Sequence, residues 1–346
     1  MMESQIDNMR KRKRYLVKTD PNVKFAKIKD IRQAQINAGE VNDSTAEVCD
    51  TDSSSESFIG SEVVSQTLEA GYHVRLSVRR ESQIDSLTKL FSEYMAKLTF
   101  VAIPDLAKPG AFNEVLWGVQ YVFHIASPVA GTGSDFMEDY LAPAQQGTIS
   151  LLNAAKTIST IKRVIIVSSI LALLPLDTQA SKVLAHRAVL EWVPKYEPNF
   201  SVITLHPSFV FGRNLTQTSA DGIDGTNSML WESFFSEKPT LLMASVDVRD
   251  VALAHLIALD VDVNGQSIVQ EFVLSTPEAA GWKWERVVQF VEERYPDLKI
   301  RLKGPFDETT KMDTKRATEL LGIRWRNMEE TISSFVDHQV ELKSQL

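Results

Sequence analysis

Two stretches of this sequence decide the fold: Tyr121-Val-Phe-His-Ile-Ala126 and Arg163-Val-Ile-Ile-Val-Ser168. Each is apolar at nearly every position, which is typical of a strand that is buried on both faces of a parallel sheet. A helical pattern over residues 137–159 separates the two stretches. A strand, a helix and a second strand in this order predict parallel strands that are joined and covered by the helix.

The same alternation extends in both directions along the chain. We expect strands at 46–49, 73–78, 99–103 and 201–206, and helices at 58–71, 87–95, 111–119 and 180–193. Beyond Phe211 the alternation weakens, and apolar groups at 230–235, 287–291 and 300–302 indicate a smaller lobe at the carboxyl edge of the sheet. The sequence therefore predicts an α/β fold, a doubly wound parallel sheet of the Rossmann type with a smaller C-terminal substrate lobe.

The first 57 residues have a different composition from the rest of the chain. Residues 1–32 hold ten Lys or Arg against four Asp or Glu, whereas residues 33–57 hold six acids and no Lys or Arg. Segregated charge of this kind is typical of a flexible tail, so we interpret 1–57 as a tail with a remnant of the first strand. We expect 58–212 to form a dinucleotide-binding domain, and 213–346 to form the substrate lobe, with elements that return to the sheet.

Bulk composition narrows the classes of partner. The 346 residues carry a net charge of -8, so no overall basic field exists to bind nucleic acid or an anionic membrane. The longest apolar stretch, residues 164–176, contains two serines and is shorter than the roughly 20 residues of a membrane-spanning helix. One cysteine and six histidines without metal-ligand spacing predict no disulfide and no metal site. We expect a cytoplasmic protein that acts on a small molecule.

Several short motifs occur together and in a fixed order along the chain. They are Phe58-Ile-Gly60, Phe123-His-Ile-Ala-Ser-Pro128, Val167-Ser-Ser169, Ala180-Ser-Lys182, Pro207-Ser-Phe-Val-Phe-Gly212 and Asp247-Val-Arg-Asp250. In these motifs the chain from Phe58 to about Val336 resembles the extended short-chain dehydrogenases, in the branch of dihydroflavonol, cinnamoyl-CoA and methylglyoxal or aldehyde reductases. The resemblance implies NADPH-dependent reduction of a ketone or aldehyde on a small metabolite, such as a ketoreductase step of secondary metabolism.

The phosphate-binding turn departs from the family pattern. A pyrophosphate site uses a Gly-x-x-Gly-x-x-Gly turn that leads into the N-terminus of a helix, where backbone amides face the anion. Alignment on the Phe58 motif places Ser54, Ser57 and Gly60 at the three glycine positions. A serine Cβ disfavours positive φ by roughly 1 kcal/mol and crowds the phosphates. The sequence leaves open whether this cradle works or is vestigial.

Other cofactor contacts follow the ends of the predicted strands. Arg79 and Arg80 follow the strand at 73–78, where cations favour the 2'-phosphate of NADP(H) over NAD(H). The resemblance places further cofactor contacts at Asp105, Leu106, Ala126, Ser127, Lys182 and Pro207. Asp105 can equally be part of an ordinary turn that ends a strand.

The predicted catalytic group lacks one member. The family carries Tyr-x-x-x-Lys, and this chain has Thr178 and Lys182 at the two positions, with Ser169 as the residue that binds the substrate oxygen. An aliphatic hydroxyl is too weak an acid to replace the tyrosine, and loss of general acid catalysis costs about 10²- to 10⁴-fold in rate. Only nine positions separate Ser169 from Thr178, so part of the usual pocket wall is missing.

Two functions are compatible with these residues. One is an NADPH-dependent reductase with impaired activity. The other is a catalytically dead homologue that binds a metabolite or a partner chain. An incorrectly assembled gene model would give the same departures from the family pattern.

Overall fold

A computed structural model describes most of the chain after residue 44. The described residues are 45–49, 54–125, 142–173, 181–241, 244–262, 268–277, 282–306 and 311–344, with the backbone alone for 45–49, 54–57, 142–144 and 181. All of these described residues except 69–71 belong to one compact unit. None of the helices in the described ranges is long and apolar enough to cross a membrane.

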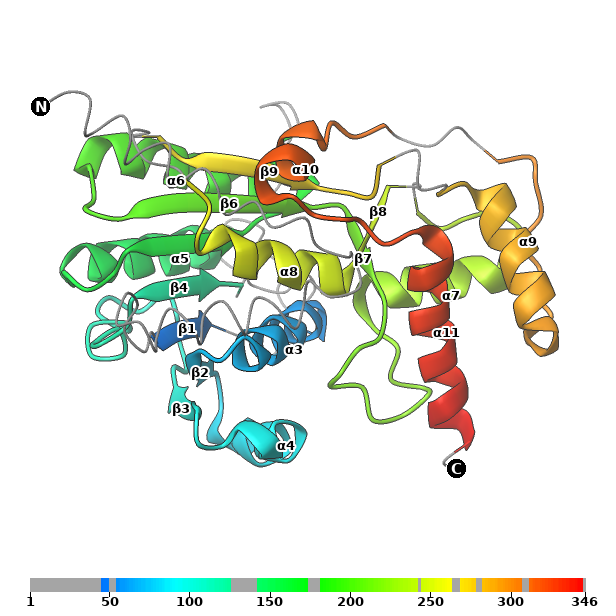
Figure 1. Ribbon diagram of the computed structural model, residues 1–346, viewed down its shortest axis with the longest axis horizontal. Helices are drawn as coiled ribbons and strands as arrows, with labels where there is room; N and C mark the ends of the chain where they lie inside the picture. The colour runs from blue at the N-terminus through cyan, green and yellow to red at the C-terminus, as the bar shows by residue number, and fades with distance from the viewer. Residues whose placement is uncertain are drawn as a thin grey trace, which may run out of the picture. The chain divides into compact units, whose positions relative to one another are not determined.

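The centre of the unit is a parallel sheet of seven strands in the order β3-β2-β1-β4-β5-β6-β9 (Figure 1). The strands are β1 (Thr45–Cys49), β2 (His73–Val78), β3 (Leu98–Ala102), β4 (Tyr121–His124), β5 (Arg163–Val167), β6 (Ser201–Pro207) and β9 (Gln270–Leu274). The strand order reverses between β1 and β4, which is the switch point where ligands of such sheets bind. The doubly wound fold expected from the sequence is confirmed.

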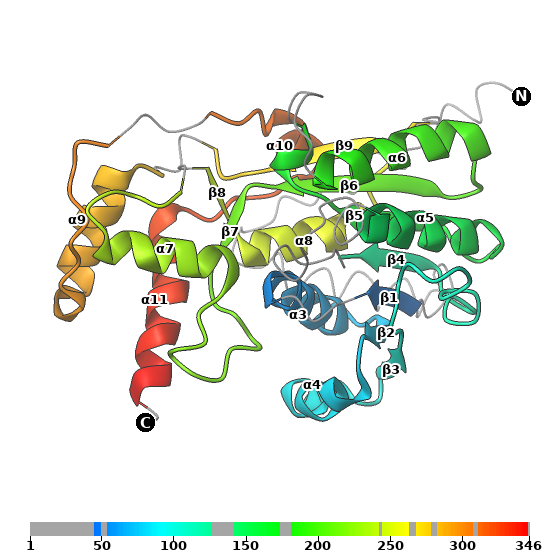
Figure 2. The same cartoon turned by 180° about the vertical axis from the view of Figure 1, so that it is seen from behind.

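Helices cover both faces of the sheet (Figure 1 and Figure 2). They are α3 (Ser54–Glu69) and α8 (Val248–Ala258) on one face, and α5 (Ala142–Lys156) and α6 (Ser181–Tyr196) on the other. On the first face, the Gln66 side chain donates to the Arg249 carbonyl over 3.0 Å and so links α3 to α8. On the second, the Trp192 indole donates to Asn153 over 2.9 Å and links α6 to α5.

The expected strand boundaries agree with the structure, and the helix boundaries differ more. The strand at 73–78 has the expected limits, and those at 201–206 and 163–168 differ by one residue. Helix α3 begins at Ser54 rather than at 58, so the positions aligned with the first two glycines lie in the helix. The helix expected at 137–159 is α5, which spans 142–156, and residues 126–141 lie outside the described part.

The short helix expected at 111–119 is wrong, because the chain makes successive turns there. The apolar spacing behind that prediction is real, since Phe112 and Leu116 are fully buried. However, Gly110 and Gly118 both have positive φ, and the Arg75 guanidinium holds the carbonyls of Val115 and Trp117 from the neighbouring strand. Isolated bonds, such as Asn113 N–H to the Gly110 carbonyl, therefore replace a regular helical ladder.

A second group of elements forms the smaller lobe. It contains the parallel pair β7 (Phe209–Phe211) and β8 (Ser245–Asp247), with α7 (Gly225–Phe235), α9 (Trp284–Arg294) and α11 (Met328–Ser344). These helices lie side by side in both views (Figure 1 and Figure 2) and share an apolar core that includes Phe234, Val287 and Phe335. Between the elements of this lobe the chain returns to the main sheet as β9, which pairs with β6.

Charged residues at the start of α8 join the lobe to the sheet. Asp247 accepts hydrogen bonds from the Arg249 side chain at 2.8 and 2.6 Å. Asp250 is fully buried, accepts from the Arg326 backbone N–H over 2.7 Å and pairs with the Arg326 guanidinium. Burial raises the pKa of Asp250 to about 6, although Arg326 opposes this effect. These contacts give the Asp247-Val-Arg-Asp250 motif a structural role.

Candidate active site

The first candidate element is the N-terminus of α3. This helix begins at Ser54, five residues after the end of β1, at the carboxyl edge of the sheet. Its first amides and the positive end of its dipole suit an anionic group. Gly60 is buried within α3, whereas the side chains of Ser54 and Ser57 lie outside the described part.

The two arginines after β2 are exposed at the same edge. The Arg80 backbone N–H donates to the Gln83 side chain over 2.9 Å, which begins the short 3-10 turn Glu81–Gln83. Because β2 is next to β1 in the sheet, these cations lie near the start of α3. This is the place at which a 2'-phosphate of a bound nucleotide would need positive charge.

Asp105 and Leu106 follow β3. The Asp105 carboxylate accepts a hydrogen bond from the Ala107 backbone N–H over 2.9 Å, so it does form the turn that ends a strand. Leu106 packs against α5, since a Cβ added to Gly147 would lie 3.5 Å from the Leu106 Cβ. The loop that carries both residues is therefore held in place by α5.

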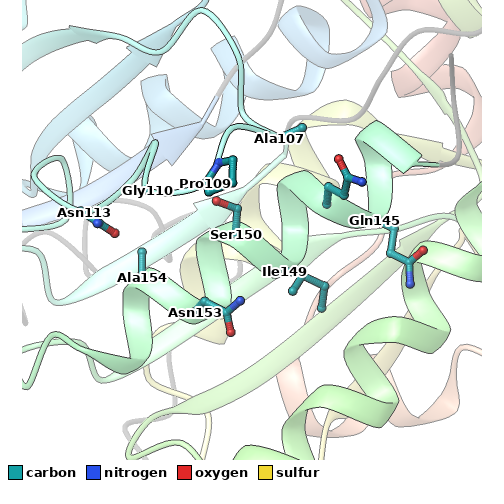
Figure 3. Close-up of a pocket in the computed structure, with 10 residues that line it drawn as sticks. Ala107, Pro109, Gly110, Asn113, Gln145, Ile149, Ser150, Asn153 and Ala154 are labelled. Atoms are coloured by element: carbon teal, nitrogen blue, oxygen red, sulfur yellow. The ribbon is translucent and has the colours of Figure 1, made fainter. Parts of the chain in front are cut away.

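A pocket of about 580 Å³ lies directly after this loop, between the loop and α5 (Figure 3). Its lining consists mostly of small or polar residues, with one larger apolar side chain, Ile149; the full set is Ala107, Pro109, Gly110, Asn113, Gln145, Gln146, Ile149, Ser150, Asn153 and Ala154. Ser169 and Lys182 are not among them. This pocket therefore does not include the predicted catalytic residues.

Lys182 lies in the first turn of α6 and is half-buried. Its charge acts on His124, the last residue of β4: burial, and then the positive charge of Lys182, lower the pKa of His124 to about 4. The His124 Nε2 atom lies 3.1 Å from the Thr148 hydroxyl. Since β4 borders the switch point, the charge of Lys182 acts on a residue at the centre of the carboxyl edge.

Ser169 lies two residues beyond the end of β5 and is also half-buried. Its Oγ accepts a hydrogen bond from the Leu171 backbone N–H over 3.2 Å. Its carbonyl accepts from the Ala172 N–H at 2.9 Å and lies 3.2 Å from the His206 Nδ1. The turn after Ser169, Ile170–Leu173, packs against α6, so Ser169 and Lys182 are brought to the same edge of the sheet.

The other predicted site residues divide into two groups. Pro207 is the last residue of β6 and is buried at the same edge. Ala126, Ser127 and Thr178 lie outside the described residues. The structure therefore describes the serine and the lysine of the expected catalytic group, together with the residues after β2 and β3 that are predicted to contact the cofactor.

The structure also brings together three side chains that the sequence did not group. His186 and His206 converge with Glu271, although no sequence spacing links them. Burial, and then the neighbouring His186, lower the pKa of His206 to about 4. The hydrogen bond from His186 lowers the pKa of Glu271. The sequence contained a partial indication of this cluster, because His186 lies one helical turn after Lys182. Glu271 could not be grouped with it, because this residue is on β9 (Gln270–Leu274), a strand that the sequence did not predict.

The described residues fit a dinucleotide. A helix N-terminus follows β1, two exposed arginines follow β2, and the charge of Lys182 acts on the last residue of β4, so positive charge acts on both sides of the switch point. An open parallel sheet with these features defines a dinucleotide-binding protein of the Rossmann type.

Comparison with known proteins narrows this class. Residues 56–197 match the family described as NAD(P)H-binding. Over 326 residues the chain is 32% identical to the ketoreductase sphI of Aspergillus fumigatus, and the match covers 82% of this chain and 95% of that protein. This chain therefore belongs to the extended short-chain dehydrogenase/reductase family, in the branch of ketoreductases and methylglyoxal reductases.

Solved structures agree with this assignment. Gre2 of Candida albicans, in complex with NADPH, is 25% identical with a TM-score of 0.70, and the match covers 86% of this chain and 99% of that one. Yeast methylglyoxal/isovaleraldehyde reductase Gre2, also complexed with NADPH, is 22% identical with a TM-score of 0.73 and coverages of 87% and 100%. The shared fold extends over both the sheet and the smaller lobe.

Proposed function

We propose that this protein reduces a ketone or aldehyde group on a small metabolite with NADPH. The observation that carries the proposal is the position of Lys182, whose charge acts on a buried histidine at the end of β4, beside the switch point. Ser169 lies at the same edge, directly before the turn that packs against α6. A hydroxyl and an ammonium at one edge suit the binding of a carbonyl oxygen and a cofactor ribose.

The relatives support the choice of reaction and cofactor. The Aspergillus relative is named a ketoreductase, and both Gre2 structures contain NADPH. In this chain Arg79 and Arg80 are exposed directly after β2, where guanidinium groups can pair with a 2'-phosphate. We therefore expect a preference for NADPH over NADH.

Each residue has a definable part in the reaction. When bound, NADPH supplies a hydride to the carbonyl carbon of the substrate. Because the Ser169 Oγ already accepts from the Leu171 N–H, its own hydrogen remains available for the substrate oxygen. The Lys182 ammonium binds the ribose hydroxyls and adds positive charge near the oxygen that becomes negative.

The supply of the proton is the weak step. Thr178 occupies the position of the family's tyrosine, and its hydroxyl is not acidic enough to protonate the oxygen at neutral pH. We propose that water donates the proton, so that the reaction is slower than with a tyrosine. The residues that bind the substrate and the cofactor still retain their roles under this proposal.

Steady-state assays on the full chain test the proposal. NADPH oxidation is followed with a set of small ketones and aldehydes, for the wild type, Ser169→Ala and Lys182→Met. The exposed residues Ser86 and Lys238 provide the matched controls, Ser86→Ala and Lys238→Met. We expect turnover in the wild type and both controls, and a loss of at least about 10-fold in each site variant. NADPH binding without turnover of any carbonyl would contradict the proposal and favour a metabolite-binding homologue.

A further inference from the structure

The cluster of His186, His206 and Glu271 lies outside the reduction site proposed above. Its residues come from three elements: His186 from α6, His206 from β6 and Glu271 from β9. The His186 Nε2 lies 2.7 Å from the Glu271 Oε1, and the His206 Nε2 lies 3.6 Å from the same oxygen. One ligand atom from each residue falls within 4.8 Å of the other two.

The pairing of β6 with β9 and the packing of α6 fix the positions of these three side chains. In the parallel pairing of β6 with β9, Thr204 is opposite Glu271, and His206 lies two residues further along on the same face. Helix α6 covers this face and places the His186 ring 4.6 Å from the His206 ring, at an interplanar angle of 84°. The side chains of His186 and His206 are 4% and 0% exposed, whereas Glu271 is 42% exposed. The cluster is therefore buried on the histidine side and open at the carboxylate.

The hydrogen bonds around His206 determine which of its nitrogens can bind a metal. The His206 Nδ1 lies 3.2 Å from the Ser169 carbonyl oxygen, which can only accept, so Nδ1 must carry the hydrogen. The neutral ring then has its lone pair on Nε2, the atom that faces Glu271. Thr204 Oγ1 is 3.0 Å from this nitrogen and can donate to it. An imidazole whose other nitrogen donates to a backbone carbonyl is the usual arrangement for a metal-binding histidine.

Without a metal ion, the His186 Nε2–H donates to the Glu271 carboxylate over 2.7 Å, so an ion bound to this nitrogen would replace that hydrogen and leave the ring protonated on Nδ1. The His186 Nδ1 is buried and has no hydrogen-bond partner within the described part of the chain. Two imidazole nitrogens and one carboxylate oxygen are thus directed toward a common point. Two histidines and a glutamate form the donor set of three-ligand zinc sites, in which a fourth position stays open to water.

We propose that His186, His206 and Glu271 bind a divalent transition-metal ion, with Zn²⁺ as the first candidate. The ion would bind both Nε2 atoms and the Glu271 carboxylate, and its open position would lie on the exposed side of Glu271. It would join α6, β6 and β9, and through His206 it would also hold the carbonyl of Ser169. The site does not depend on the proposed reduction, because none of its three ligands takes part in that reaction.

Zinc titration of the metal-free full chain tests this site. The protein is dialysed against a chelator, and Zn²⁺ binding is then measured by calorimetry for the wild type, Glu271→Gln, His206→Ala and a His73→Ala control on β2. We expect one Zn²⁺ per chain for the wild type and the control, with affinity at least about 10-fold weaker in both cluster variants. Zn²⁺ should also raise the melting temperature of the wild type but not that of Glu271→Gln.

The nearly isosteric Glu271→Gln variant keeps the test valid if His206→Ala fails to fold. Co²⁺ provides an independent signal, because tetrahedral Co²⁺ bound to histidine and carboxylate absorbs visible light more strongly than Co²⁺ in water. The absence of stoichiometric Zn²⁺ binding by the wild type would overturn the proposal. Equal binding by wild type and Glu271→Gln would overturn it as well, because it would indicate metal on other histidines.

Discussion

At the scale of single residues, the environment of Lys182 is set by a neutral imidazole. His124 is fully buried, and both its burial and the nearby ammonium favour the uncharged ring. A charged His124 would repel Lys182, so the low pKa of the histidine protects the position of the lysine. In the proposed reaction the ammonium then binds the ribose without a charged His124 beside it.

Restoring the family's acid should accelerate the proposed reaction. In Thr178→Tyr a phenol replaces the aliphatic hydroxyl four positions before Lys182, and we expect kcat for carbonyl reduction to rise by about 10²- to 10⁴-fold. The measurement is NADPH oxidation at saturating cofactor and substrate. Thr178→Phe is the matched control, since it adds the ring without the hydroxyl. Equal rates for the Tyr and Phe variants would show that the missing acid does not limit turnover.

The sequence could predict some site residues and not others, for a physical reason. Arg79, Arg80 and Asp105 are placed by the ends of strands, which short apolar patterns reveal. The grouping of His186, His206 and Glu271 depends instead on the pairing of β6 with β9, which are more than 60 residues apart. No local pattern encodes such a pairing, so this cluster appears only in the structure.

At the scale of elements, Arg163 connects the sheet to the end of α8. One of its guanidinium nitrogens donates to the carbonyls of Ala258, Leu259 and Val261 at 2.6, 3.0 and 2.9 Å. The last carbonyls of a helix have no partner within the helix, and a cation at that end also favours the helix dipole. Arg163 thus stabilises the helix that links the sheet to the smaller lobe.

Removing this charge should destabilise the fold. We expect Arg163→Met to lower the free energy of unfolding by about 2 kcal/mol, because hydrogen bonds from a charged group to buried acceptors are lost. Urea denaturation followed by circular dichroism measures the change. The exposed Arg324 gives the control variant Arg324→Met, which should change stability by no more than about 0.5 kcal/mol. If both variants unfolded at the same urea concentration, the claim that Arg163 stabilises the end of α8 would be refuted.

The error at 111–119 shows where element prediction fails. Phe112 and Leu116 have helical spacing and are buried as a helix would bury them. The backbone nevertheless follows turns, because the side chain of Arg75, on another strand, holds two of its carbonyls. By contrast, the apolar runs of β2, β5 and β6 depend only on local sequence, and their limits were predicted to within one residue.

At the scale of the whole molecule, buried histidines make stability depend on pH. Burial lowers the pKa of His124 and of His255 from 6.5 to about 4. The unfolded chain therefore takes up protons at higher pH than the folded chain does. The contribution of these residues to stability is present above pH 6.5 and is lost as the pH falls to about 4. Asp250 acts in the opposite direction, because burial raises its pKa to about 6.

We expect the free energy of unfolding to fall between pH 6.5 and pH 4, since three histidines with a lowered pKa, His124, His206 and His255, outweigh one aspartate. His255→Leu should reduce this loss of unfolding free energy by up to about 3 kcal/mol near pH 4, because leucine binds no proton. The leucine would keep an apolar contact with Phe123, which packs against the His255 ring. Urea denaturation at several pH values gives the comparison. An identical pH dependence in the wild type and His255→Leu would show that His255 does not contribute.

The central claim is that this chain binds NADPH at the carboxyl edge of its sheet, and a fluorescence titration with NADPH and NADH tests it most directly. We predict saturable binding with a clear preference for NADPH. In an Arg79→Ala, Arg80→Ala double variant this preference should shrink by about 10- to 100-fold, as expected when charge-assisted hydrogen bonds to a phosphate are lost, and Arg324→Ala should leave it unchanged. Saturable NADPH binding whose preference over NADH shrinks only in the double variant would support the claim, whereas no saturable binding of either nucleotide to the wild type would contradict it.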